Sequence, residues 1–476
     1  LLSTPCTKLE IVTGKFATVF GLSLVTALLN FASMAATLAL VISQARGAAA
    51  NPADTGLPAL QVDAAAVAAV LLVLIPLALF ISAVMMSIAV FARSFKEAQN
   101  YVTPFMLLIV TPAMVSVLPG VKLSGVTAVM PIANIVLLFK DLMTGQASID
   151  NVFVVLLSTS VFAGLALLFA TWLFQREDIV LGGGPSGLSL HRAGLPTTRT
   201  PTPGLAFGAF FTVLVLIMYL GTLAQSWSIL PGLLITEYGL ILAPCLALPW
   251  FFRVDLRETL PLRPVSVAQL AGALLCGLGG LIFVIQVGAW HNKILPVPQE
   301  LQEAFSSLFA SGGTPGGLAI LILCVALTPA ICEEVLFRGV LFAGFKNRMP
   351  GLATVLLVGF LFGVFHLSIH RFASTALLGV LLTYLIWRTG SLLPGMIVHF
   401  LVNSTSILLA TGHVPESVVT GLHLDTAETS GVWWPLLLGA SISLIMGCAL
   451  LERARIHTPR HCEESATKQS PDADAA

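Results

Sequence analysis

The sequence has very little charge. Only 10% of its 476 residues are charged, 57% are hydrophobic, and the mean hydropathy is +0.96. An ordinary soluble protein carries roughly 25% charged residues, so the composition excludes the soluble globular class. The formal net charge is zero, and we expect no nucleic acid among the partners. The chain is expected to lie in a membrane lipid bilayer.

Motifs for metal, disulfide and nucleotide chemistry are also absent. The cysteines lie mostly inside apolar stretches and show no CxxC pair, which argues against a disulfide framework or a zinc knuckle. Neither an HExxH zinc motif nor a GxxxxGK[ST] phosphate loop occurs. We therefore expect no cofactor and no metal. The chain begins with Leu1 and shows no signal-peptide pattern, so we expect a fragment of a longer protein.

Long apolar stretches take up most of the chain. A spanning helix needs roughly 20 mostly apolar residues. Runs such as Val70–Phe91 and Val152–Phe174 are continuous, unlike the alternating segments of a membrane β-barrel. We therefore expect an all-α polytopic transmembrane protein with about twelve spans. These are placed at residues 17–45, 64–92, 103–120, 151–174, 205–227, 230–252, 266–288, 316–342, 350–370, 372–388, 391–411 and 432–451.

Composition divides the chain into two membrane modules. A Gly/Pro-rich linker at 181–204 follows a first module, 1–180, with four expected spans. Within that module, Pro131–Gly145 is too short to span, and we expect an interfacial or re-entrant helix. The second module, 205–455, has eight expected spans, and the polar tail 456–476 is expected to be disordered.

Basic residues indicate the orientation. With a cytoplasmic N-terminus, about seventeen loop Lys and Arg residues fall on the cytoplasmic side and about five on the other. This bias is typical of a correct topology under the positive-inside rule. We predict a multi-pass protein of the cell (inner) membrane with both termini cytoplasmic.

The eighth expected span contains three ionisable residues in sequence EEVLFR: Glu333, Glu334 and Arg338. Each costs roughly 2.5 to 3.5 kcal/mol at the centre of a spanning helix. Glu334 and Arg338 are i,i+4 neighbours and can pair, whereas Glu333 points about 100° away. A carboxylate without that partner can act as a general base. The alternative is a structural ion-pair network between helices.

Two later spans add polar side chains at a similar depth. One ends in FGVFH, with His366, and another contains HFLVN, with His399 and Asn403 on one helix face. Counting along the helices places Glu333, His366 and His399 roughly 12 to 24 Å deep. These groups can share one cavity, expected to open to the cytoplasm, and can activate water and stabilise an oxyanion. Each residue alone is also typical of helix–helix hydrogen bonding.

The three motifs EEVLFR, FGVFH and HFLVN resemble, in order and spacing, the EExxxR, FxxxH and HxxxN signatures of the CAAX-protease and bacteriocin-processing (CPBP) family. The resemblance covers about Leu205 to Leu451. It implies an intramembrane glutamic endopeptidase, like the CAAX prenyl proteases, that acts on a peptide substrate. Catalytic Glu333, assisted by His366, would activate the water, and His399 and Asn403 would hold the oxyanion.

The same resemblance gives Glu334, Arg338 and Phe362 a supporting role in the site. His370 is extra to the pattern and is expected to be solvated. The same residues allow two alternative chemistries. Two histidines and a glutamate can ligate zinc, but HExxH is absent and an amide is a poor zinc ligand. A nucleophilic Cys332 has no evident base on its own helix.

The first module resembles the C-terminal half of a type-2 ABC transporter permease of the sodium- or drug-export sort, carried by LLSTPCTKLEIVTGKFATVF at residues 1–20 and by the spans that follow. This implies that residues 3–15 contact a separate ATP-binding subunit. The alternative is a set of extra helices without a transport role. For the whole chain, the alternative function is a non-catalytic exporter subunit or a bacteriocin self-immunity protein, and a proteolysis assay distinguishes them.

Overall fold

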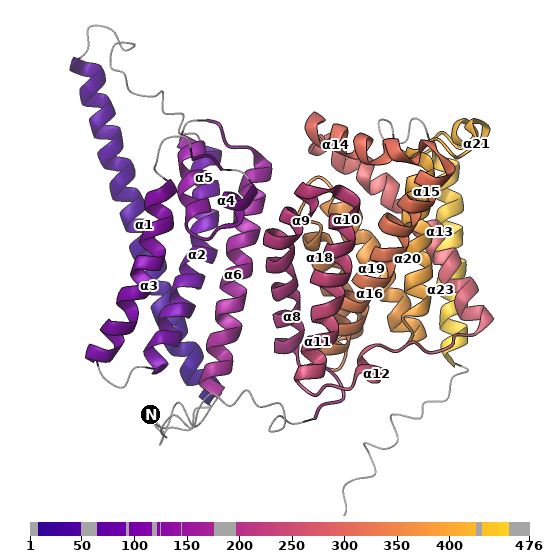
Figure 1. Ribbon diagram of the computed structural model, residues 1–476, viewed down its shortest axis with the longest axis horizontal. Helices are drawn as coiled ribbons and strands as arrows, with labels where there is room; N and C mark the ends of the chain where they lie inside the picture. Colours follow the sequence, from indigo (N-terminus) through magenta and orange to yellow (C-terminus); the bar gives the residue numbers. More distant parts are fainter. Residues whose placement is uncertain are drawn as a thin grey trace, which may run out of the picture. The chain divides into compact units, whose positions relative to one another are not determined.

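The computed structural model describes residues 8–48, 64–91, 95–116, 121–123, 125–143, 145–175, 197–424 and 431–456. In these ranges the ordered elements are helices, and the one β-feature is an isolated bridge between Thr198 and Val254. Ten helices are long and apolar enough to cross a membrane. The chain is therefore an all-α, multi-pass membrane protein (Figure 1), as the sequence predicts. Most of the predicted linker and the tail beyond Ile456 lie outside the described residues.

The ten candidate spans are fewer than the twelve expected, and the reason lies in two helices. One is α3 (Phe95–Ser116), which is not among the ten. The other is α18 (Gly351–Phe365), an apolar helix of 15 residues. The sequence placed this span at 350–370, but the helix ends at His366 and the next residue, Leu367, has a left-handed backbone (φ 52°). The chain turns there instead of continuing.

The chain divides into two compact units. Unit 1 comprises residues 1–195 and 207–223, and unit 2 comprises 196–206 and 224–476. The helices of unit 1 are α1 (Lys8–Ala48), α2 (Ala64–Phe91), α3, α4 (Gly125–Val129), α5 (Ala133–Met143) and α6 (Ile149–Gln175), with most of α8 (Pro203–Leu216) and the π-helix η3 (Ile217–Gly221).

In unit 1, the short helix α5 packs against α6 through polar groups. Asn134 of α5 is fully buried and donates a hydrogen bond to the Ser158 hydroxyl of α6 at 2.9 Å. Buried Leu137 and Leu138 of α5 join the same core. A short helix was predicted in this region, and its depth in the bilayer stays a prediction. The span expected at 205–227, which the sequence assigned to the second module, mostly packs with this unit, where Tyr219 donates to the Val129 carbonyl at 2.9 Å.

Unit 2 contains the remaining helices. They are α9 (Thr222–Trp227, which begins in unit 1), α10 (Ile229–Leu234), η4 (Ile235–Leu242), α11 (Ala243–Phe251), α12 (Leu256–Thr259), α13 (Val267–Ile294), α14 (Gln299–Ala310), η5 (Ser311–Gly313), α15 (Pro315–Leu321), η6 (Ile322–Leu327), α16 (Thr328–Glu334), η7 (Val335–Leu341), α17 (Phe342–Phe345), α18, α19 (Phe372–Thr389), α20 (Leu393–Ala410), α21 (Glu416–Gly421) and α23 (Trp434–Ile456).

Helix α13 packs closely against several others because glycines lie at the crossings. A Cβ added at Gly277 would lie 2.7 Å from Val398 Cγ1 of α20. One added at Gly279 would lie 2.5 Å from the Ala440 carbonyl oxygen of α23. Small residues allow helix backbones to approach closely in a membrane, where apolar burial does not drive helices together. The crossing at Gly277 places α20, which carries two of the predicted site residues, against α13.

Helices α18 and α19 cross through glycines as well. A Cβ at Gly379 would lie 2.9 Å from the Gly359 carbonyl oxygen and 2.7 Å from Cβ of Phe362. The close crossing leaves Phe362 and the Gly379 carbonyl side by side. Both then contact Arg338, as described below.

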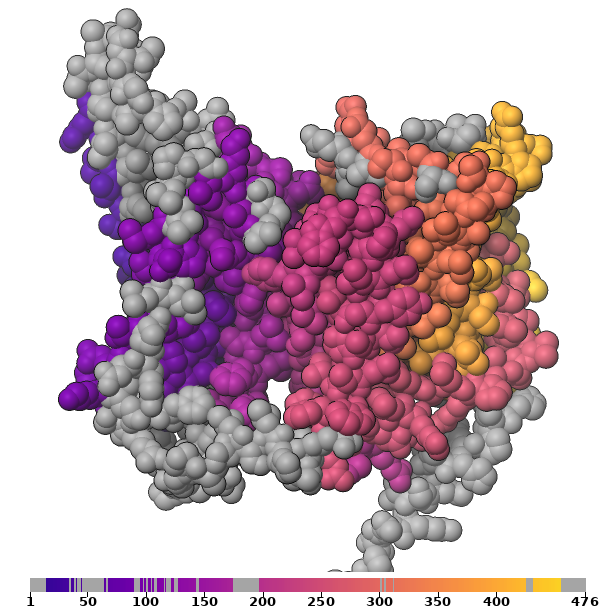
Figure 2. Space-filling view, viewed as in Figure 1, coloured from indigo at the N-terminus to yellow at the C-terminus, as the bar shows by residue number. Residues whose placement is uncertain are grey.

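The outer faces of unit 2 are apolar. The stretch formed by α10, η4 and α11 lies at the surface in Figure 2 (pink) and exposes Ile235, Leu246 and Trp250. Exposed apolar side chains in a spanning helix suit contact with lipid. The polar side chain of Glu237, on the same helical stretch, is only 4% exposed.

Candidate functional site

The site is built on one long span, Pro315–Phe345, in which the helix changes between α and π geometry. The π-helical η6 and η7 lie on either side of α16, whose last two residues are Glu333 and Glu334. π-Helical turns are rare in proteins, but those that occur are often found at functional sites. The ionisable residues of this span therefore lie where the helix geometry is irregular.

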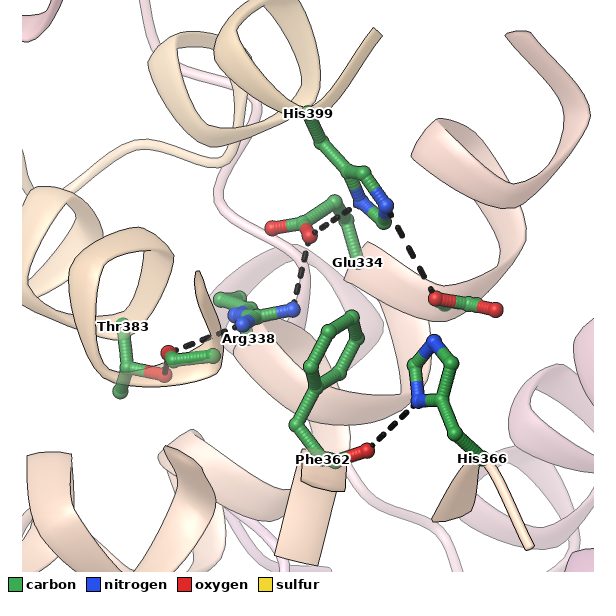
Figure 3. Close-up of polar contacts among 8 residues, drawn as sticks. Glu334, Arg338, Phe362, His366, Thr383 and His399 are labelled. Carbon is green, nitrogen blue, oxygen red and sulfur yellow. Dashed lines mark hydrogen bonds and ion pairs between the residues drawn. The ribbon is translucent and has the colours of Figure 1, made fainter. Parts of the chain in front are cut away.

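Glu334 and Arg338 form the i,i+4 ion pair that the spacing predicts. Arg338 Nη1 donates to Glu334 Oε1 at 2.8 Å, and both side chains are 0% exposed. Arg338 Nη2 also donates to the Gly379 carbonyl at 3.0 Å, and its guanidinium carbon lies 4.5 Å from the centre of the Phe362 ring. Figure 3 shows the Arg338 side chain among these partners. The pair is completely desolvated, so loss of one partner leaves a buried charge.

His399 is oriented by the same carboxylate. Its Nδ1 lies 3.0 Å from Glu334 Oε1 (Figure 3). A carboxylate only accepts hydrogen bonds, so Nδ1 carries the proton in this contact. The other ring nitrogen, Nε2, lies 3.9 Å from Glu333 Oε2, which is too long for a hydrogen bond. That oxygen of Glu333 is buried and has no hydrogen-bond partner among the described residues.

His366 is fixed by the backbone of its own helix. Its Nδ1 lies 2.8 Å from the Phe362 carbonyl oxygen, which can only accept, so Nδ1 carries the hydrogen. In a neutral imidazole, Nε2 then has a free lone pair and can accept a proton. The Phe362 ring makes edge contacts with both histidines, at centroid distances of 4.8 Å to His366 and 5.8 Å to His399. Phe362 thus contacts both imidazoles.

Asn403 lies one turn beyond His399 on α20. Its side chain is half-buried, and Nδ2 donates to the Val325 carbonyl of η6 at 3.4 Å. This is a long hydrogen bond, and the amide has a second N–H to donate. The contact ties α20 to the span that carries Glu333.

The contacts join most of the predicted site residues into one network. Glu333 lies beside His399, which contacts Glu334, and His366 and His399 share the Phe362 ring. The cooperation of Glu333 with His366 stays a prediction, as does the opening of a cavity to the cytoplasm. In the described part of the chain, no three His, Cys, Asp or Glu side chains are grouped to hold one metal ion. The prediction that no metal is needed requires a direct test.

Sequence reasoning was wrong about His370 and missed Glu237. His370 is only 8% exposed, and its Nδ1 lies 3.3 Å from the Leu295 carbonyl oxygen. The residues that follow α13 cover it, which its position in the sequence does not reveal. Glu237 is the lone charged residue in Ile229–Phe251, and that isolation is the signal that could have identified it.

Comparison with known proteins gives one match. Residues 315–405 match the family described as "Type II CAAX prenyl endopeptidase Rce1-like". Neither a search of curated proteins nor a search of solved structures finds a match to the chain. The matched segment covers less than half of the chain and includes all of the predicted site residues, from Glu333 to Asn403. The part of the chain that holds the polar network is therefore the part that is similar to CAAX prenyl endopeptidases.

Proposed function

We propose that unit 2 is an intramembrane glutamic endopeptidase of the CPBP type, which hydrolyses a peptide bond of a membrane-associated or exported peptide. The main support is the environment of Glu333. Its buried Oε2 has no hydrogen-bond partner among the described residues and lies 3.9 Å from Nε2 of His399. An unsatisfied acceptor beside an oriented imidazole is a suitable place to bind and activate a water molecule.

In this proposal Glu333 is the general base. Glu333 Oε2 and His399 Nε2 lie 3.9 Å apart. Both atoms can therefore contact one water molecule that lies to the side of the line joining them. The water oxygen bonds to the carbonyl carbon while its proton passes to Glu333, assisted by the free lone pair of His366 Nε2. When the tetrahedral intermediate collapses, the C–N bond breaks and the proton passes from Glu333 to the leaving nitrogen.

His399 and Asn403 stabilise the negative charge on the carbonyl oxygen. Nδ1 of His399 donates to Glu334, so His399 can donate to the oxyanion from Nε2 when both ring nitrogens carry a hydrogen. The Asn403 amide can donate its second N–H, or release the long bond to Val325. Donors placed at a developing oxyanion are a large part of catalysis in acyl transfer.

The test is hydrolysis of a labelled membrane peptide by the purified protein and by Glu333→Ala. We expect the hydrolysis rate of Glu333→Ala to fall to background. The control is Glu258→Ala, which changes a glutamate whose side chain is 47% exposed and should keep full activity. Equal hydrolysis by Glu333→Ala and the wild type would contradict the proposal. Absence of hydrolysis in every variant would favour the non-catalytic exporter or self-immunity role.

The same assay tests whether a metal is involved. We expect activity to survive a strong chelator, because carboxylate, imidazole and amide groups can carry out every step above. Activity that disappears with the chelator and returns with zinc would make Glu333, His366 and His399 metal ligands instead.

For residues 1–180 we propose a partial ABC permease module with a separate ATP-binding subunit, supported only by the sequence resemblance. The basic residues support a location in the inner membrane with both termini cytoplasmic. Co-purification of an ATPase subunit with the full chain tests the first proposal, and labelling of introduced cysteines at both termini from either side tests the second.

A further inference from the structure

A second unpaired carboxyl group lies close to the proposed catalytic glutamate. Glu237 belongs to the π-helix η4, and its Oε2 is buried without a hydrogen-bond partner among the described residues. The hydroxyl of the neighbouring Thr236 does not donate to Glu237, because it donates to the Gly232 carbonyl at 2.8 Å. Glu237 faces inward, while Ile235 and Tyr238 are exposed on the apolar outer face.

The helix packing brings Glu237 to the site. η4 packs against α16 and η7, the helices that carry Glu333 and Arg338. The buried side of η4, which carries Glu237, faces these helices, and Cys332 beside Glu333 is fully buried as well. The three buried carboxyl groups of the described residues, those of Glu237, Glu333 and Glu334, thus belong to one region of unit 2.

The partners of the three carboxyl groups differ in charge. Glu334 contacts Arg338 and His399, and Glu333 lies beside His399. Glu237 makes no ion pair among the described residues, and α16, against which its helix packs, carries the acidic Glu333. A buried carboxylate without a partner is costly and becomes neutral by binding a proton. Two carboxyl groups that share a site do not both ionise readily.

We propose that Glu237 and Glu333 form a carboxylic acid–carboxylate pair in which Glu237 carries the proton and donates a hydrogen bond to Glu333. Such a bond gives the buried Glu237 carboxyl group a partner, and the Glu333 carboxylate, which can accept several hydrogen bonds, can still hold the water. Glu237 is then a positioning residue, which holds the Glu333 carboxylate toward the water. During hydrolysis one proton enters the pair from water and one leaves to the amine nitrogen, so the pair begins and ends each cycle with one proton.

This inference deepens the proposed function, but its first test does not require hydrolysis. The full-length protein is studied by infrared spectroscopy for the carbonyl stretch of a protonated carboxylic acid, which shifts when H2O is replaced by D2O. We expect the band in the wild type and in Glu258→Gln, and we expect its loss in Glu237→Gln. Glu333→Gln should keep the band at a shifted frequency, because Glu237 stays protonated when its neighbour is neutral.

The opposite pattern would overturn the pair. A wild type without the band, or a band that persists unchanged in Glu237→Gln, shows that Glu237 does not hold the proton. Glu237→Asp is the second variant, since it retains the carboxyl group and should shift the band without removing it. An unshifted band in Glu237→Asp also counts against the proposal.

Activity then separates a positioning role from a structural one. Gln has the size of Glu and can donate a hydrogen bond but cannot release a proton, so Glu237→Gln should lower turnover about a hundredfold with unchanged thermal stability. Glu237→Asp should recover part of that loss. Equal activity of Glu237→Gln and the wild type would overturn the positioning role. A band that follows Glu237 in a protein that hydrolyses nothing would retain the pair and reject the proposed function.

Discussion

Replacing Glu334 by alanine should destabilise the second unit far more than replacing its neighbour Glu333. Glu334 Oε1 accepts hydrogen bonds from both Arg338 at 2.8 Å and His399 at 3.0 Å, and the Glu334 side chain is 0% exposed. Without it, Arg338 keeps the Gly379 carbonyl and the Phe362 ring but has lost its paired carboxylate. A charge is then left buried and unpaired.

The size of the effect follows from that burial. Removing one partner of a buried ion pair costs about 3 to 5 kcal/mol, which is a large part of a typical unfolding free energy of about 5 to 15 kcal/mol. For a unit of this size, the loss corresponds to a fall in the apparent Tm of roughly 6 to 20 °C. Glu333→Ala removes a carboxyl group that is not part of the Arg338 ion pair and leaves no unpaired charge behind, so we expect a change within about 1 kcal/mol.

The assay is thermal unfolding of the purified variants in one detergent, together with their yields. A double variant, Glu334→Ala with Arg338→Met, provides the control, because removal of both charges should recover most of the loss. Equal losses for Glu333→Ala and Glu334→Ala would refute this division of roles. So would a double variant that is no more stable than Glu334→Ala alone.

Two further predictions concern α20. A Cβ at Gly395 would lie 2.9 Å from Glu334 Oε2, so Gly395→Ala should lower the free energy of unfolding by about 1 to 3 kcal/mol. The control is Gly439 of α23, where an added Cβ meets nothing within 4 Å. Gly439→Ala should therefore be neutral or stabilising by up to about 1 kcal/mol, and identical Tm values for the two variants would count against the packing. Asn403→Ala should lower turnover roughly a hundred- to a thousandfold with little change in Tm. Ser406→Ala, on the exposed side of the same helix, should keep wild-type turnover.

The sequence by itself determined the features that depend on one helix at a time. Low charge and long apolar runs identify an all-α membrane protein, because a bilayer admits only helices or closed barrels and continuous apolar runs are typical of helices. The i,i+4 spacing of Glu334 and Arg338 predicts their ion pair, and the structure contains it. The same spacing leaves Glu333 on another face of the helix. Motif order also identified the segment that matches the CAAX endopeptidase family.

Only the tertiary structure decided which helices meet and which atoms they bring together. The contact between His399 and Glu334 joins residues 65 apart in sequence, and it depends on how α20 is rotated against α16. Glycine crossings set the approach of α18 to α19, and so the place of Phe362 beside Arg338. The burial of His370 and Glu237 arises in the same way. Helical periodicity defines a face within one helix but not the partner that covers it, so these contacts required the packed structure.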